Sequence, residues 1–113
     1  MVIIAFSNKT SKILPRIFCR RFRHCAPIVC VERKLIMYQF TNIHNITPIE
    51  LNNRDIRILR AHGWRFIYVP IDVPDDFNPQ YAYSCVDLSK HALGIKNKFI
   101  QTPYRLYKNI APQ

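Results

Sequence analysis

Cys85 is the residue of this sequence whose type and position best suit chemistry. It follows Ser84, and Asp87 lies three residues after that serine, a spacing that predicts a helix capped by Ser84 with Cys85 as its first residue. Backbone N–H groups and the positive end of the helix dipole stabilise a thiolate at such a position. The same N–H groups could also bind an oxyanion. The alternative is that Cys85 is a small buried residue that fills space under the helix.

A thiolate nucleophile needs a partner that shuttles protons, usually a histidine held by a third polar group. His24 suits this role because it lies in an expected strand, residues 22–31. A turn at residues 32–34 then leads into a second apolar and aromatic strand, residues 35–41. In this hairpin we expect His24 to face residues 39–41.

The remaining elements must position these two residues. We expect a buried strand from Val2 to Phe6 and a strand from Trp64 to Val73. Three helices are expected. The first begins at Thr47, where Glu50 completes a capping box, and ends at about Ala61 before Gly63. The second extends from Cys85 to Leu93 before Gly94, and the third from Thr102-Pro103 to about Ile110. In the first helix, Ile49, Ile56 and Leu59 would share an inward stripe. This order predicts a single α+β domain over residues 1–113, with helices packed on a mainly antiparallel sheet. Whether residues 1–12 belong to the core or are peripheral stays open.

The chain is strongly basic, with 17 Lys and Arg against 7 Asp and Glu and a formal net charge of +10. Such a balance favours contact with polyanions, including nucleic acid and acidic polymers. The cations form two groups: Arg16, Arg20, Arg21 and Arg23 near the N-terminus, and Lys96, Lys98, Arg105 and Lys108 near the C-terminus. A solvated basic face explains the same residues. No recognised nucleic-acid motif is present, and the two glycines do not form a phosphate-binding loop or a dinucleotide fingerprint.

Four cysteines raise the question of disulfides and metals. The short apolar N-terminus lacks the features of a secretory signal, and no apolar run reaches the roughly 20 residues that span a bilayer. We therefore expect a cytoplasmic protein with reduced thiols and no membrane span. Zinc is an alternative, because Cys19, His24, Cys25 and Cys30 lie within twelve residues. Their spacing lacks a Cys-x-x-Cys knuckle, and neighbours in a strand point to opposite faces, so we expect no metal and no cofactor.

Three segments together resemble a known superfamily: Phe22-Arg23-His24-Cys25, the helix from Ser84-Cys85-Val86 to Gly94-Ile95, and Thr102-Pro103-Tyr104-Arg105-Leu106-Tyr107. They look like small phage and bacterial members of the papain-like, NlpC-type cysteine hydrolases in the circularly permuted form. In that branch, which includes lecithin:retinol acyltransferase-like proteins, the histidine strand precedes the cysteine helix. The order of His24 and Cys85 matches this arrangement.

The resemblance implies that Cys85 is the nucleophile and His24 the general base. The third position would lie on the strand after the histidine, where Gln39 is our choice and Asn42 and His44 are alternatives. That position is normally His, Asn, Asp or Gln, and this sequence departs from the family in offering no unambiguous orienting acid or histidine there. A glutamine stabilises an imidazolium less than a carboxylate does. We therefore expect a thiol hydrolase or acyltransferase acting on an amide or ester of a peptide-like or acyl substrate. The alternative is a catalytically degenerate basic module that binds nucleic acid or a host protein. The oligomeric state is left open.

Overall fold

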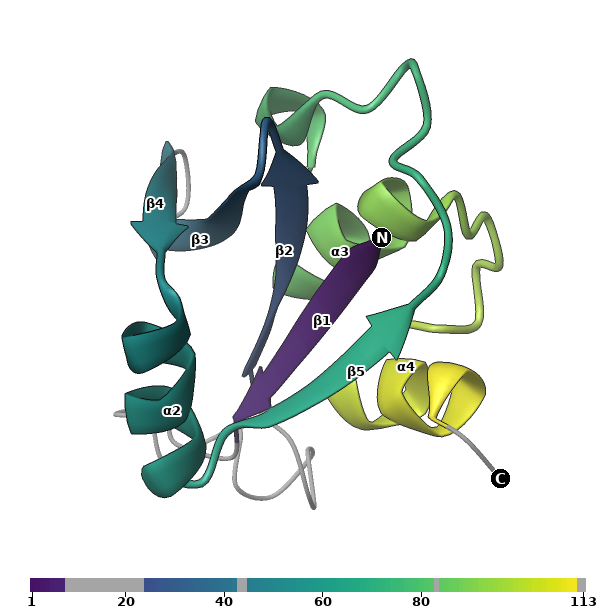
Figure 1. Ribbon diagram of the computed structural model, residues 1–113. Coiled ribbons are helices and arrows are strands. Elements are labelled where there is room, and N and C mark those ends of the chain that lie inside the picture. The colour runs from purple at the N-terminus through teal and green to yellow at the C-terminus, as the bar shows by residue number, and fades with distance from the viewer. Residues whose placement is uncertain (8–23, 43–44, 83, 112–113) are drawn as a thin grey trace.

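The computed structural model describes residues 1–7, 24–42, 45–82 and 84–111, which form an α+β domain with a five-stranded antiparallel sheet and three α-helices (Figure 1). The elements in chain order are β1 (Val2–Ser7), β2 (His24–Val31), β3 (Lys34–Asn42), β4 (Asn45–Leu51), α2 (Asn53–Ala61), β5 (Arg65–Val69), a short 3₁₀ helix (Pro79–Tyr81), α3 (Cys85–Leu93) and α4 (Pro103–Ile110). The predicted fold class is therefore confirmed at the level of an α+β domain. Within these ranges, no helix is long and apolar enough to cross a bilayer.

The sheet has the strand order β4-β3-β2-β1-β5. β1 lies inside it, paired with β2 from Val2↔Val29 to Ser7↔His24 and with β5 on its other side. All six residues of β1 are buried, as expected for an interior strand that is covered on both faces. Residues 2–7 thus belong to the core, which answers the question that the sequence left open for this part of the N-terminus.

The predicted hairpin between β2 and β3 is present. Its ladder joins Ile28↔Met37 through Val31↔Lys34. Glu32 and Arg33 at the turn both have positive φ, 51° and 66°, which is the backbone conformation of the two-residue turn that matches the twist of paired strands.

The helix predicted to begin at Thr47 does not begin there. Residues Asn45–Leu51 form β4, and Pro48 lies opposite Tyr38 on this edge strand, where its missing N–H breaks no interior ladder. The actual cap is Asn52, which forms a capping box with Asp55. Pairing with β3 therefore outweighs the local capping signal. The inward stripe is wrong in one member, because Ile49 lies on β4 and is 37% exposed, whereas Ile56 is buried.

The strand predicted for residues 64–73 is shorter than expected. β5 ends at Val69, whose partner Val2 is the first residue of β1. Beyond that point β1 offers no further partner in the ladder, and Pro70 has no N–H to donate. Residues 70–78 continue as a loop towards the 3₁₀ helix.

The sheet buries a separate apolar cluster on each face. On one face, α3 and α4 cover a cluster that includes Ile4, Phe6 and Cys25, with Val86 and Leu106 from the helices. On the other, Ile56 of α2 packs with Ile3, Ala5, Ala26 and Ile28. The predicted bounds of α3 and α4 are confirmed, with Ser84 and Thr102 as caps and Gly94 at φ 70° after α3.

Candidate active site

The first turn of α3 fixes the position of Cys85. The Ser84 hydroxyl accepts a hydrogen bond from the Asp87 N–H at 3.1 Å, and Cys85 is the first residue of the helix. Buried side chains, among them Leu88 and Ala92, anchor the helix on the sheet. Cys85 itself is half-buried and packs against the cluster that contains Cys25. Its sulfur therefore lies at the dipole's positive end with one side against β2.

The start of β2 supplies polar partners to this sulfur. They lower the pKa of Cys85 from 9.0 to about 4, with the hydrogen bond from the Cys25 side chain as the largest cause. Burial raises this pKa and so opposes the shift. Hydrogen bonds from the His24 side chain and from the Cys25 backbone N–H lower it further, as does the positive charge of His24. Hydrogen bonds to the charged form and a nearby positive charge both favour a thiolate. The structure thus brings Cys85 and His24 together, while their roles as nucleophile and base stay predictions.

Cys25 is the partner that the sequence analysis missed. It is 1% exposed, and burial raises its pKa well above 9.0, with Cys85 raising it further. The Ser89 hydroxyl lies 3.5 Å from the Cys25 sulfur and donates to it. The two thiols are therefore unequal, because Cys85 is stabilised as a thiolate and Cys25 as a neutral thiol. Only the packing of α3 on β2 reveals this pair, and no spacing in the sequence indicates it.

Trp64 is the second missed residue. Its ring meets the His24 imidazole edge to face, with centroids 5.8 Å apart and an interplanar angle of 89°. Trp64 is itself held by a hydrogen bond from its backbone N–H to the Leu59 carbonyl near the end of α2. It can therefore restrict the orientation of the imidazole. The position of the chain's one tryptophan directly after Gly63 is a signal that could have raised interest in it.

Gln39, the residue predicted to orient His24, has other contacts. It pairs with Thr47 of β4, and its side-chain amide donates to the Met37 sulfur at 3.4 Å. It lines a pocket over α2 with Ile58 and Leu59. The β2–β3 ladder reaches Met37 but not Gln39, whereas the β3–β4 ladder runs on to Asn42. The role of Gln39 behind His24 stays a prediction. Asn42 is the last residue of β3, and His44 lies outside the described residues.

The alternative zinc site gains no support from the part of the chain that is described. There, no three His, Cys, Asp or Glu side chains converge as a metal site requires. Cys30 is exposed and lies five residues along β2 from Cys25, which is about 16 Å at the rise of a strand. Cys19 lies outside the described residues.

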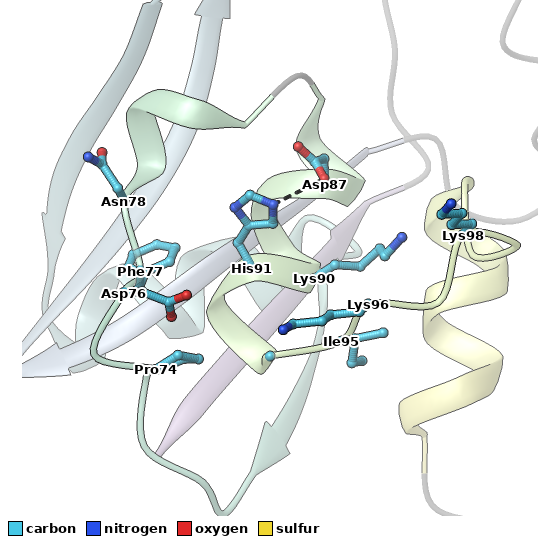
Figure 2. Close-up of a pocket in the computed structure, with 11 residues that line it drawn as sticks. Pro74, Asp76, Phe77, Asn78, Asp87, Lys90, His91, Ile95, Lys96 and Lys98 are labelled. Atoms are coloured by element: carbon cyan, nitrogen blue, oxygen red, sulfur yellow. Dashed lines mark ion pairs between the residues drawn. The ribbon is translucent and has the colours of Figure 1, made fainter.

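The predicted polyanion-binding residues are described for one group only. Arg16, Arg20, Arg21 and Arg23 fall in residues 8–23, outside the described ranges, whereas Lys96, Lys98, Arg105 and Lys108 are all exposed. Lys96 and Lys98 line a pocket of about 680 Å³ between the loop at Pro74–Asn78 and the outer side of α3 (Figure 2).

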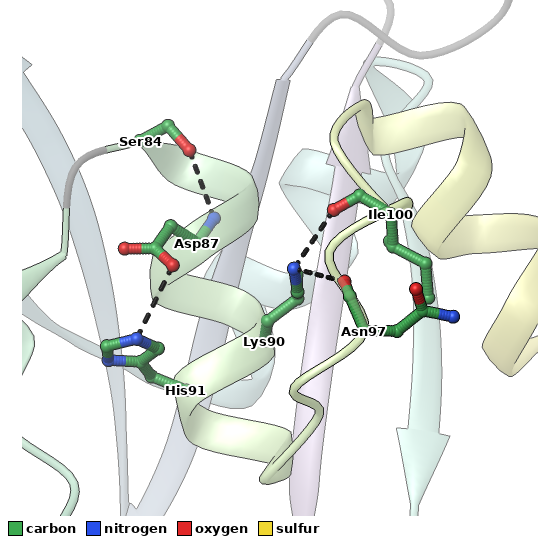
Figure 3. A network of polar contacts seen from close by, with 6 residues as sticks. All are labelled: Ser84, Asp87, Lys90, His91, Asn97 and Ile100. Atoms are coloured by element: carbon green, nitrogen blue, oxygen red, sulfur yellow. Dashed lines mark hydrogen bonds and ion pairs between the residues drawn. The ribbon is translucent and has the colours of Figure 1, made fainter.

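The outer side of α3 is tied to its surroundings by polar contacts (Figure 3). The Lys90 ammonium donates to the carbonyls of Asn97 at 2.6 Å and Ile100 at 3.1 Å. His91 lies 3.4 Å from the Asp87 carboxylate. By helical spacing, residues 87, 90, 91 and 94 share one side of α3, while residues 85, 89 and 92 face the sheet. The pocket and the Cys85 site therefore lie on opposite sides of one helix.

The start of α3 thus offers a thiolate, an imidazole that contacts it and the N–H groups of a first helical turn. These are the parts that nucleophilic acyl transfer requires: a nucleophile, a base and an oxyanion donor. Comparisons of the chain with protein-family models, with curated proteins and with solved structures find no match.

Proposed function

We propose that the protein is a thiol hydrolase or acyltransferase that cleaves an amide or ester bond through an acyl-enzyme on Cys85. The observation that carries this proposal is the contact between Cys85 and His24 at a helix N-terminus, where the pKa of Cys85 falls to about 4. A thiolate that persists at neutral pH is the activated form of this nucleophile.

The reaction follows from these parts. The Cys85 thiolate adds to the carbonyl carbon, and N–H groups of the first turn of α3 stabilise the developing oxyanion. His24 gives its proton to the leaving amine or alkoxide. The imidazole then takes a proton from water or from an acceptor alcohol or amine, which attacks the thioester and releases Cys85. Trp64, edge to face with His24, would keep the imidazole oriented while it exchanges protons.

The permuted papain-like arrangement is part of this proposal. A strand that begins with His24, followed later in the chain by a helix that begins with Cys85 and packs on that strand, supports it.

An activated ester tests the proposal. With p-nitrophenyl acetate, we expect a burst of about one equivalent of nitrophenolate and an acetyl group on Cys85, located by mass spectrometry. Cys85→Ser should lose the burst, and Cys30→Ser, at an exposed cysteine, should keep it. An acetyl group found only on other residues, or a burst that survives Cys85→Ser, would contradict the proposal.

The second candidate is a non-catalytic module that binds polyanions. It is favoured by the exposure of all four C-terminal cations and by the pocket that Lys96 and Lys98 line (Figure 2). Binding to a single-stranded oligonucleotide should then weaken steeply with salt. Lys96→Ala with Lys98→Ala should make the salt dependence shallower, by about one in the slope for each phosphate that a lysine neutralises. Binding that is independent of salt would remove this candidate.

A further inference from the structure

Cys25 has no role in acyl transfer beyond its hydrogen bonds to Cys85. Yet it is a second thiol in direct contact with the proposed nucleophile, brought there by the packing of α3 on β2. Both cysteines are unpaired by disulfides in the structure. A buried cysteine that only filled core space would not need a reactive thiol as its neighbour.

We propose that Cys25 and Cys85 form a redox-responsive dithiol, in which hydroperoxides oxidise Cys85 and Cys25 then closes a reversible disulfide that blocks the active site. The inference rests on the proposed function in one respect, since both need a reactive thiolate at Cys85. It assigns a modification site and its reagent class, and it gives Cys25 the role of resolving cysteine.

The chemistry proceeds in two steps. The Cys85 thiolate attacks one oxygen of hydrogen peroxide; an S–O bond forms, the O–O bond breaks, and the released hydroxide becomes water by taking a proton from the His24 imidazolium. The Cys25 sulfur then attacks the sulfenic sulfur of Cys85. An S–S bond forms, the S–O bond breaks, and the hydroxide leaves as water with the proton of the Cys25 thiol. The two thiols are oxidised by two electrons, and peroxide is reduced to two waters.

Burial separates the roles of the two sulfurs. Cys85 is half-buried, so a small oxidant can reach it, whereas Cys25 is 1% exposed and is shielded from solvent. Oxidation should therefore begin at Cys85, because thiolate character and access decide which cysteine reacts. Cys25 is therefore expected to react with the sulfenic acid of Cys85 rather than with peroxide in solution.

Ser89 assists the second step. Its hydroxyl donates to the Cys25 sulfur at 3.5 Å from within α3, where Ser89 is fully buried. This hydrogen bond favours the charged form of Cys25 and so opposes the cost of burying a thiolate. The polar contacts thus follow one another in a row, from Ser89 to Cys25, from Cys25 to Cys85 and from Cys85 to His24.

A disulfide would have two consequences for the site. It removes the thiolate, so acyl transfer should stop until the bond is reduced. It also removes the sulfenic acid before further oxidation to sulfinic acid, which is irreversible for most proteins. The pair would therefore protect the nucleophile while switching it off.

The test uses the full chain with Cys19→Ser and Cys30→Ser, so that Cys25 and Cys85 are the thiols that remain. The protein is treated with an excess of hydrogen peroxide, because sulfinic acid needs two peroxides per thiol, then blocked with N-ethylmaleimide and digested without reduction. We expect a Cys25–Cys85 cross-linked peptide, lighter by two hydrogens than the reduced pair, and full recovery of maleimide labelling after dithiothreitol. If Cys85 is oxidised to sulfinic acid with no cross-link, the proposal is overturned.

Two variants keep the result interpretable. In Cys25→Ser, and in Cys25→Ala as a second choice should the serine disturb the fold, peroxide should drive Cys85 to sulfinic acid, and dithiothreitol should not restore labelling. Because Cys25 also lowers the pKa of Cys85, the comparison uses the fraction of oxidised Cys85 that ends as sulfinic acid rather than the rate of oxidation. An equal fraction with and without Cys25 would contradict a resolving role. The ester burst, measured on untreated protein, reports separately on acyl transfer. A cross-link without a burst therefore rejects the proposed function alone, and a burst without a cross-link rejects the dithiol alone.

Discussion

Helices α2 and α3 begin with similar caps but place different groups at their first positions. At α2, the Asn52 side chain accepts from the Asp55 N–H at 2.8 Å, and the Asp55 carboxylate accepts from the Asn52 N–H at 3.0 Å. At α3, the Ser84 hydroxyl accepts from the Asp87 N–H. The first residue of α2 is the exposed Asn53, whereas that of α3 is Cys85, packed against β2.

The difference shows what a helix start needs before it becomes a candidate site. Both starts have first-turn N–H groups and the positive dipole end that favour an anion. At α2 the Asn52 side chain accepts from the Asp55 N–H and the Asp55 carboxylate accepts from the Asn52 N–H, so the helix closes its own cap in solvent. At α3 a nucleophilic side chain takes the first position, and β2 adds His24 and Cys25 to it. The low pKa of Cys85 therefore depends more on the strand that the helix meets than on the cap.

The largest effect should come from His24. His24→Ala should lower the rate of acyl transfer by about 10²–10⁴-fold, the range typical of a lost general acid–base group. His91→Ala is the matched control, because His91 belongs to α3 but contacts Asp87 on the outer side of the helix. Steady-state hydrolysis of p-nitrophenyl acetate measures both. If both variants lost the same fraction of the hydrolysis rate, the two sides of α3 would not differ in their contribution to activity.

The pH dependence of folding should differ between the parent and Cys85→Ser. The pKa of Cys85 is depressed in the folded protein, from 9.0 to about 4. Its stabilising contribution is therefore fully present above about pH 9 and is lost as pH falls towards about 4. In urea unfolding, the parent should lose stability relative to Cys85→Ser as the pH is lowered through this window. A difference between the two that is constant with pH would show that the thiolate contributes nothing to the fold.

The smallest effect should come from the caps. Ser84→Ala and Asn52→Ala should each lower the free energy of unfolding by about 1 kcal/mol, since each removes one side-chain acceptor at a helix start. Only Ser84→Ala should also slow the alkylation of Cys85, because it loosens the turn that carries the thiol. Urea unfolding and iodoacetamide labelling of both variants make the comparison. Slower labelling in Asn52→Ala would mean that the effect is global.

The sequence predicts those helices whose ends carry local capping signals. Ser84 and Gly94 bound α3, and Thr102 begins α4, so both helices could be placed. At Thr47 the same reasoning failed, because pairing of β4 with β3 competes with the cap and the true start is Asn52. Where pairing with a distant strand decides where a helix or strand begins, local capping patterns do not predict that position.

The residues of the candidate site also fall into two groups, those with a local sequence signal and those without one. Cys85 was proposed from its helix position and His24 from its strand, because each signal is local; their catalytic roles stay predictions. Cys25 and Trp64 were missed, since their importance arises from the packing of α3 on β2 and from a ring contact with His24. Neither packing register nor ring geometry follows from spacing along the chain.

The most direct test of Cys85 as the nucleophile is the pH profile of its alkylation by iodoacetamide, read by mass spectrometry on the folded protein. The reference is the same cysteine in urea, whose labelling should rise about tenfold per pH unit below its ordinary pKa. Because the pKa of Cys85 in the folded protein is about 4, the folded profile should be flat from about pH 5 to 8. Cys25→Ala and His24→Ala should each move its midpoint upwards. A folded profile that parallels the urea profile would contradict the assignment of Cys85 as a nucleophilic thiolate.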